Sequence, residues 1–301
     1  MITTFGSINC DLVVSVERLP RAGETVKGPD YQMFAGGKGA NQALAARRAG
    51  AEVRFVGAVG RDGFAETALS GLAAGGVNLD GVRTLDGPTG VALIAVDRRG
   101  ENQIVVASGA NARVDAGWVS AGLNVDDVLL TQLEVPIGET VKAVKAAEEL
   151  GATSILNAAP FAALPADMLR ALSILIVNQQ EAATLAAQLD LPADPRDFPP
   201  ALFERFGTRA VFTLGADGAA GFDGYNRIAV TAPAIKPVDT TGAGDAFTGV
   251  FAAALDDQKP FRRAMSEGVA AGSLACMETG AQTSLPKRER IEQMADEIGG
   301  S

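Results

Sequence analysis

Short apolar runs alternate along the chain with longer segments in which apolar residues recur at helical spacing. The apolar runs predict strands at residues 2–5, 53–59, 128–131, 154–157, 174–177 and 210–214. The longer segments predict helices at residues 41–49, 64–74, 138–150, 180–189, 244–255 and 261–277. The proline-rich segment 191–200 predicts a surface loop. This alternation is typical of an α/β protein with helices packed on the faces of a sheet.

Two early stretches depart from this alternation. Residues 12–16 and 25–34 are strand-like on either side of a turn at Pro20 and Gly23. Residues 90–96 and 103–107 flank a second turn and predict a hairpin. We expect these pieces to form a small separate β lid. Extra edge strands on the main sheet are the alternative that periodicity leaves open.

Composition narrows the class of protein. The 301 residues are 47% hydrophobic and 21% charged, as in a globular protein, and the net charge of −10 argues against a nucleic-acid partner. Cys10 and Cys276 are far apart in sequence and predict neither a disulfide framework nor a zinc site, which suits the cytoplasm. We expect no secretory signal and no membrane span, because no apolar stretch is long enough.

The chain contains no histidine. This excludes Ser-His-Asp and Cys-His triads, histidine metal sites and histidine general bases. Acid–base chemistry therefore has to come from carboxylates, lysine, tyrosine or cysteine.

A run of small residues, 239–245, leads into a predicted helix and ends in Asp245. Backbone N–H groups at such a helix N-terminus favour an anion, including the charge that develops on a transferring phosphoryl group. A carboxylate in the same turn would repel a phosphate, but it suits a base that accepts a proton from an attacking hydroxyl. The alternative is that Asp245 merely caps the helix or favours its first turn.

A second glycine-rich loop, 36–42, carries Lys38 and Asn41. It fails the Walker pattern, because Gly39 stands where Ser or Thr is required, and it fails GxGxxG at Gln42. The loop suits a polyhydroxylated ligand that needs several donors and acceptors. A glycine loop that only enters a helix is the alternative.

Polar residues follow the predicted strands. Open α/β sheets bind ligands outside the carboxyl ends of their strands, so these residues are candidates for a common site. They are Asn9, Asp11, Glu134, Asn157, Asn178 and the turn 213–218.

Taken together, these motifs resemble the ribokinase branch of the ribokinase/phosphofructokinase-B family of sugar kinases. The segment 239–245 matches the Asp-Thr-x-Gly-Ala-Gly-Asp signature, and 36–42 reads Gly-Gly-Lys-Gly-Ala-Asn-Gln. The segments 132–134 and 157–160 are similar as well, and the matches extend in order from residue 6 to residue 282. The chain departs from the usual pattern at Gln179, in place of an acid, and at Val135, which we expect near the sugar.

The resemblance implies one kinase domain over residues 1–301, a three-layer αβα sandwich around a mostly parallel sheet, with a β lid from about 12–35 and 90–108. It implies transfer of the ATP γ-phosphoryl group to a primary hydroxyl of a pentose, D-ribose above all. The resemblance also implies a homodimer that forms through the lid. Another sugar, a nucleoside, or a catalytically silent sugar-sensing protein are the alternatives.

The resemblance also implies roles for single residues. Asp245 would be the base, and Gly242, Ala243 and Gly244 would form the anion hole. Asp245 would also contact the sugar, together with Asn9, Asp11, Gly37, Lys38, Asn41 and Glu134. ATP would contact Asn178, Thr213, Gly215, Gly218, Gly244 and Val269.

Two metal ions are implied in the same way. Glu181 would support Mg²⁺ through its water shell. A K⁺ ion beside the anion hole would be bound, mostly by backbone carbonyls, at Asp239, Thr241, Ala275, Glu278, Gly280 and Ser284.

Overall fold

A computed structural model describes residues 1–299 and contains two separate β-sheets in that range. The main sheet has the strand order β13-β12-β11-β10-β9-β8-β1-β4-β5. Neighbouring strands from β5 to β11 pair in parallel, whereas β12 and β13 pair antiparallel at one edge. The strands are β1 (Ile2–Phe5), β4 (Val53–Gly60), β5 (Asn78–Leu85), β8 (Val128–Thr131), β9 (Thr153–Asn157), β10 (Ile174–Asn178), β11 (Arg209–Thr213), β12 (Ala219–Phe222) and β13 (Arg227–Val230).

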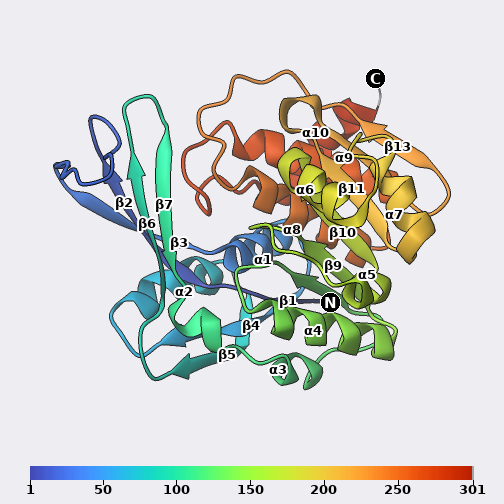
Figure 1. The fold of residues 1–301 in the computed structure, drawn as a ribbon, viewed down its shortest axis with the longest axis horizontal. Helices are drawn as coiled ribbons and strands as arrows, with labels where there is room; N and C mark the ends of the chain where they lie inside the picture. The colour runs from blue at the N-terminus through green and yellow to red at the C-terminus, as the bar shows by residue number, and fades with distance from the viewer. Residues whose placement is uncertain (300–301) are drawn as a thin grey trace.

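Helices cover both faces of this sheet and complete three layers (Figure 1). One buried cluster joins the sheet to α1 (Lys38–Arg48), α2 (Phe64–Ala74), α8 (Ala243–Asp256), α9 (Phe261–Ala275) and α10 (Arg288–Gly299). Two other clusters join it to α3 (Gly117–Ser120), α4 (Ile137–Leu150), α5 (Ala166–Ala171), α6 (Gln179–Leu189) and α7 (Phe198–Phe206). Successive side chains of a strand point to opposite faces, so Leu130 lies in the first cluster and Leu129 in another. The predicted α/β sandwich is confirmed.

The second sheet has the order β3-β2-β6-β7 and stands away from the layers (Figure 1). Its strands are β2 (Asn9–Ser15), β3 (Tyr31–Gly36), β6 (Gly90–Val96) and β7 (Asn102–Ala107). The early β pieces therefore form a sheet of their own and do not extend the edge of the main sheet. Because β2 begins at Asn9 and β3 ends at Gly36, one end of this lid sheet lies beside the glycine-rich loop 36–42.

Most predicted elements are present with ends that move by a few residues, but the strand expected at 25–34 begins only at Tyr31, and several elements were not predicted. These are β5, β12, β13, α3, α5, α7, α10 and the 3₁₀ turns η1 (Gly109–Arg113) and η2 (Gly215–Asp217). The loop predicted at 191–200 ends early, because α7 begins at Phe198 and takes Pro199 into its first turn. Proline is tolerated there, since N–H groups in a first turn have no partner within the helix. Among the described helices, none combines the length and apolar character needed to cross a bilayer.

Candidate active site

Asp245 lies in the first turn of α8 and is only 7% exposed. Its side chain makes no capping bond to its own helix. The carboxylate instead accepts hydrogen bonds from the first helix of the chain: Asn41 Nδ2 donates to Oδ2 at 2.9 Å, and Gln42 Nε2 donates to Oδ1 at 2.9 Å. The capping alternative is therefore wrong, and the carboxylate is held in one orientation by α1.

The N-terminus of α8 begins at Gly242, which has φ 77°. This left-handed conformation suits glycine, and a Cβ there would approach Ala281 Cα to 3.1 Å. No side chain caps the helix. The Ala243 N–H contacts Thr240 O at 3.3 Å, and the remaining N–H groups of the first turn are available for an anion. An anion at this position would lie in the same turn as Asp245.

Glu134, which follows β8, ties two other segments together. One carboxylate oxygen accepts a hydrogen bond from Ser7 Oγ at 2.6 Å and another from the Lys38 backbone N–H at 3.0 Å. The Lys38 ammonium is largely enclosed, and the charges of Asp245 and Glu134 raise its pKa. The site thus contains a cation that stays charged among carboxylates.

Asn9 is 2% exposed, and its orientation is fixed by Asn111 of η1. Asn111 Nδ2 donates to Asn9 Oδ1 at 2.8 Å and to Ile8 O at 3.1 Å, while its Oδ1 accepts from Ile8 N at 3.0 Å. With its oxygen occupied, Asn9 offers its Nδ2 donor to a ligand.

Asp11 lies close to other carboxylates without a cation of its own. Burial, together with the charges of Glu134 and Asp245, raises its pKa from 3.8 to about 7. Its Oδ1 is buried and has no hydrogen-bond partner among residues 1–299. An unsatisfied carboxylate oxygen at this position is a ready acceptor for a ligand hydroxyl.

Asn178 and Glu181 form a capping box at the start of α6. Asn178 N donates to Glu181 Oε2 at 2.8 Å, and Glu181 N donates to Asn178 Oδ1 at 2.9 Å. Burial raises the pKa of Glu181, while the Asn178 N–H and the Lys38 charge oppose this shift. Gln179 is exposed beside them, so the departure from the usual acid leaves the Glu181 carboxylate in place.

Two adjoining cavities meet at the N-terminus of α8. A cavity of about 220 Å³ is lined by Lys38, Asn178, Glu181, Gly242 and Asp245, among others. A larger and more apolar one, of about 460 Å³, is lined by residues that include Gly215, Ala216, Gly218, Ala232, Pro233, Ile235, Ala243, Phe247 and Val269. Both walls contain Thr213, Thr240 and Gly244. A ligand long enough to occupy both cavities would pass over the first turn of α8.

The residues implied for K⁺ lie around the loop that follows α9. Asp239 Oδ2 accepts a hydrogen bond from Gly280 N at 2.8 Å, and Oδ1 accepts one from Thr241 N at 2.9 Å. Partial burial acts to raise the pKa of Asp239, but these hydrogen bonds outweigh it, so the pKa is lowered. Ser284 Oγ donates to Ala281 O at 3.0 Å, and Glu278 N donates to Ala275 O at 3.3 Å. Within residues 1–299, no three Cys, Asp or Glu side chains gather as a metal cluster. Both carboxylate oxygens of Asp239 accept backbone N–H groups, and binding of K⁺ at this loop stays a prediction.

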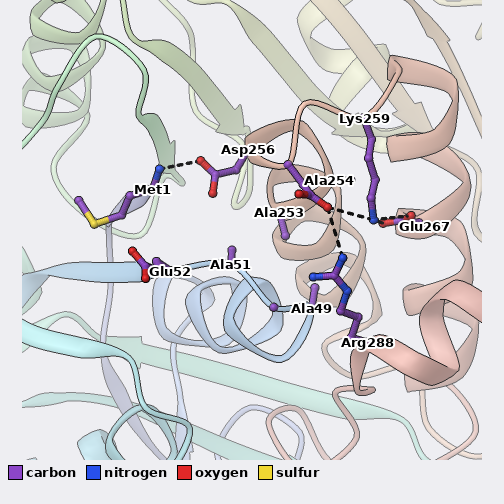
Figure 2. Close-up of a pocket in the computed structure, with 12 residues that line it drawn as sticks. Met1, Ala49, Ala51, Glu52, Ala253, Ala254, Asp256, Lys259, Glu267 and Arg288 are labelled. Carbon is purple, nitrogen blue, oxygen red and sulfur yellow. Dashed lines mark hydrogen bonds and ion pairs between the residues drawn. The ribbon is translucent and has the colours of Figure 1, made fainter.

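A third cavity, of about 290 Å³, lies at the opposite ends of α1 and α8 (Figure 2). Several of its charged side chains are paired: Lys259 Nζ contacts Glu267 Oε1 at 2.9 Å, and Arg288 contacts Asp257 at 3.3 Å. None of the residues predicted for the site lines it. These ion pairs join the end of α8 to α9 and α10 and belong to the packing of the helices.

Three residues of this network were missed as candidates. Ser7 and Gln42 lie within quoted motifs but were given no role, and Asn111 lies in an element that was not predicted. Their importance depends on tertiary partners, which periodicity does not reveal. Val135 is 5% exposed and packs in a buried hydrophobic cluster with Phe5 and Ala110, and its expected position near the sugar stays a prediction.

Comparison with known proteins gives a consistent family. The model of the pfkB family carbohydrate kinases matches residues 1–288. The chain is 36% identical to the ribokinase of Haemophilus influenzae, covering 96% of each chain. It is 38% identical to a bifunctional ribokinase/ribose-5-phosphate isomerase A of Fructilactobacillus sanfranciscensis over 96% of its own length, but it spans only 55% of that longer protein.

Solved structures agree. The ribokinase of Thermotoga maritima superposes with a TM-score of 0.89 at 30% identity, covering 98% of this chain and 99% of that one. The Arabidopsis thaliana ribokinase complexed with ribose and ATP gives a TM-score of 0.87 at 30% identity, covering 98% of each chain. The chain belongs to the pfkB family of carbohydrate kinases.

Proposed function

We propose that this protein transfers the γ-phosphoryl group of ATP to the primary hydroxyl of D-ribose, giving D-ribose 5-phosphate and ADP. The observation that carries the proposal is the position of Asp245. Its oriented carboxylate lies in the first turn of α8, whose N-terminus has no side-chain cap, where the two cavities meet. Similarity to ribokinases across nearly the whole chain supports ribose as the acceptor.

In this proposal Asp245 is the general base. It removes the proton from the sugar hydroxyl while that oxygen attacks the γ-phosphorus, and the bond from the γ-phosphorus to the bridging oxygen of ADP breaks. The first-turn N–H groups at Gly242, Ala243 and Gly244 stabilise the charge that spreads over the phosphoryl oxygens. Lys38 adds a positive charge on the same side, because it lines the cavity that contains Asp245.

The two substrates take opposite sides of this turn. Asn9, Asp11 and Glu134 would bind sugar hydroxyls, together with the loop at Gly37 and with Asn41. The apolar cavity around Val269 would hold the nucleotide base, and the turn from Thr213 to Gly218 would hold the phosphates. Asn178 would contact ATP from the smaller cavity, whose wall it shares with Asp245.

Two ions assist the transfer in this proposal. Mg²⁺, bound to the ATP phosphates, would be supported through water by Glu181, whose carboxylate lines the smaller cavity. K⁺ would bind beside Asp239 and brace the loop that packs on Gly242. Rates that are equal in sodium and potassium buffers would reject the K⁺ site.

The lid sheet would close over the sugar and join two subunits. Its apolar side chains are unusually exposed, including Tyr31 at 57%, Ile104 at 52% and Val105 at 65%. Such a patch is typical of a protein interface. Pairing of two lids would therefore make a homodimer, with the lid regions 12–35 and 90–108 acting as part of a single kinase domain.

The experiment that tests the proposal measures ADP release from MgATP across ribose, deoxyribose, fructose, arabinose, ketodeoxygluconate and adenosine, with and without potassium. The proposal predicts a clear preference for ribose. A preference for another sugar or for adenosine would contradict ribose and keep the phosphoryl transfer. Binding of ribose without any turnover would instead favour a sugar-sensing protein.

A further inference from the structure

The Gln42 side chain is completely buried in α1, at 0% exposure, and faces the base. Its Nε2 donates one hydrogen bond to Asp245 Oδ1 at 2.9 Å and another to Asn157 Oδ1 at 3.0 Å. One carboxamide therefore bridges the first turn of α8 and the carboxyl end of β9. A buried amide with both protons used in this way has little freedom to rotate.

Gln42 and Asn41 act on different oxygens of the same carboxylate. Asn41 holds Oδ2 and Gln42 holds Oδ1, so the two donors fix both the position and the rotation of the Asp245 carboxylate. A carboxylate has about four acceptor sites, so each oxygen keeps a lone pair for the proton of an attacking hydroxyl. Asn41 is already implied in sugar binding, whereas the hydrogen bonds of the Gln42 side chain go to Asp245 and Asn157.

Because α1 packs closely on α8, the side chains of Asn41 and Gln42 are long enough to reach Asp245. Gly249 of α8 faces α1, and a Cβ at this position would come within 2.2 Å of Gln42 O and 2.7 Å of Ala45 Cβ. Only glycine allows the two helices to approach so closely. The position of the base is thus set by the helix contact and by the carboxamide bridge together.

We propose that Gln42 is a positioning residue for phosphoryl transfer: it locks the Asp245 carboxylate in the orientation that accepts the proton, by bridging it to Asn157. This inference rests on the proposed function, because it assigns the orientation of the same base. Gln42 does not itself touch the reacting atoms.

The test is a double-mutant cycle with Gln42→Met and Asp245→Asn. Methionine keeps the shape of glutamine and removes both donors. We expect Gln42→Met to lower kcat by about 10- to 100-fold, the size expected for a lost hydrogen bond to a charged group. The KM values for ribose and ATP should change less than about twofold, since positioning acts on the transfer step. Added to Asp245→Asn, the same substitution should change kcat less than about twofold.

Two results would overturn the proposal. One is a Gln42→Met protein with the kcat of the wild type. The other is that Gln42→Met lowers kcat by the same factor in the wild type and in the Asp245→Asn protein, which would mean a general structural effect. Gln42→Asn serves as a second variant: it keeps a buried carboxamide but is one methylene too short to reach both partners, so it should show the same loss. Thr140→Val, a buried change in α4 that removes no hydrogen bond, is the control and should keep wild-type kcat.

A second readout separates this inference from the proposed function. Urea unfolding of the wild type, Gln42→Met, Asp245→Asn and the double variant measures the coupling between Gln42 and Asp245 without any turnover. Coupled unfolding free energies, with no activity of the wild type on any sugar, would reject the kinase proposal and keep the link between the two side chains. Additive unfolding free energies would reject the link itself, whatever the activity.

Discussion

Replacing Asp11 by asparagine should stabilise the free protein, and the gain should grow with pH. Burial and the charges of two neighbouring carboxylates raise the pKa of the Asp11 carboxyl in the folded protein from 3.8 to about 7. The folded state therefore binds this proton more tightly than the unfolded state does. Folding is favoured in acid, and this contribution is lost as the pH rises from about 4 to about 7.

The magnitude follows from the two pKa values. Compared with a side chain that stays neutral, Asp11 should destabilise the fold by about 2 kcal/mol at pH 5, where only the unfolded state has released the proton, and by about 4 kcal/mol at pH 8. Asparagine is close in shape and cannot ionise, so Asp11→Asn escapes this penalty. The stability of the variant relative to the wild type should therefore increase by about 2 to 3 kcal/mol between pH 5 and pH 8.

The assay is urea unfolding of sugar-free protein at both pH values. Asp126→Asn is the matched control, because it removes the same charge from an exposed turn. The control should show no comparable change with pH. A difference between Asp11→Asn and wild type that is equal at pH 5 and pH 8, or a variant less stable than wild type at pH 8, would refute the reasoning.

Three further predictions concern binding and assembly. Asn111→Leu frees Asn9 and should raise the KM for ribose by about 5- to 30-fold, with the KM for ATP unchanged; an unchanged ribose KM in initial-rate assays would contradict this. Glu181→Gln should raise the Mg²⁺ concentration needed for half-maximal rate and leave the ribose KM alone, and a titration at fixed ATP that matches wild type would reject it. Val105→Lys, in an exposed position of β7, should shift a dimer to monomer in sedimentation velocity, whereas an unchanged sedimentation coefficient would remove the lid from the interface.

Much of the fold could be predicted from the sequence, because its strands are strongly patterned. The runs at Ile2–Phe5 and Val128–Thr131 are short and wholly buried, and both were predicted at their observed ends. The lid was predicted as separate because its strands break the alternation. By contrast, β12 contains Gly221 and β13 begins with Arg227, so neither is an uninterrupted apolar run, and α5 has only six residues, too few to establish a helical period.

The site was predictable where a motif carries the chemistry and not where a partner does. The segment ending in Asp245 contains small residues and an acid before a helix, so a carboxylate in the first turn of a helix could be predicted from it, and its role as a base stays a proposal. Gln42 and Asn111 carry no local signal, because each acts through a residue that is about a hundred or more positions away.

The measurement that tests the central claim most directly compares wild type with Asp245→Asn, using ADP release with saturating ribose and MgATP and calorimetric titration of ribose binding. The account predicts a kcat lower by about 10²- to 10⁴-fold with a ribose Kd within a few-fold of wild type, because the base is lost while the other sugar contacts remain. Wild-type turnover by the Asp245→Asn protein would contradict the account.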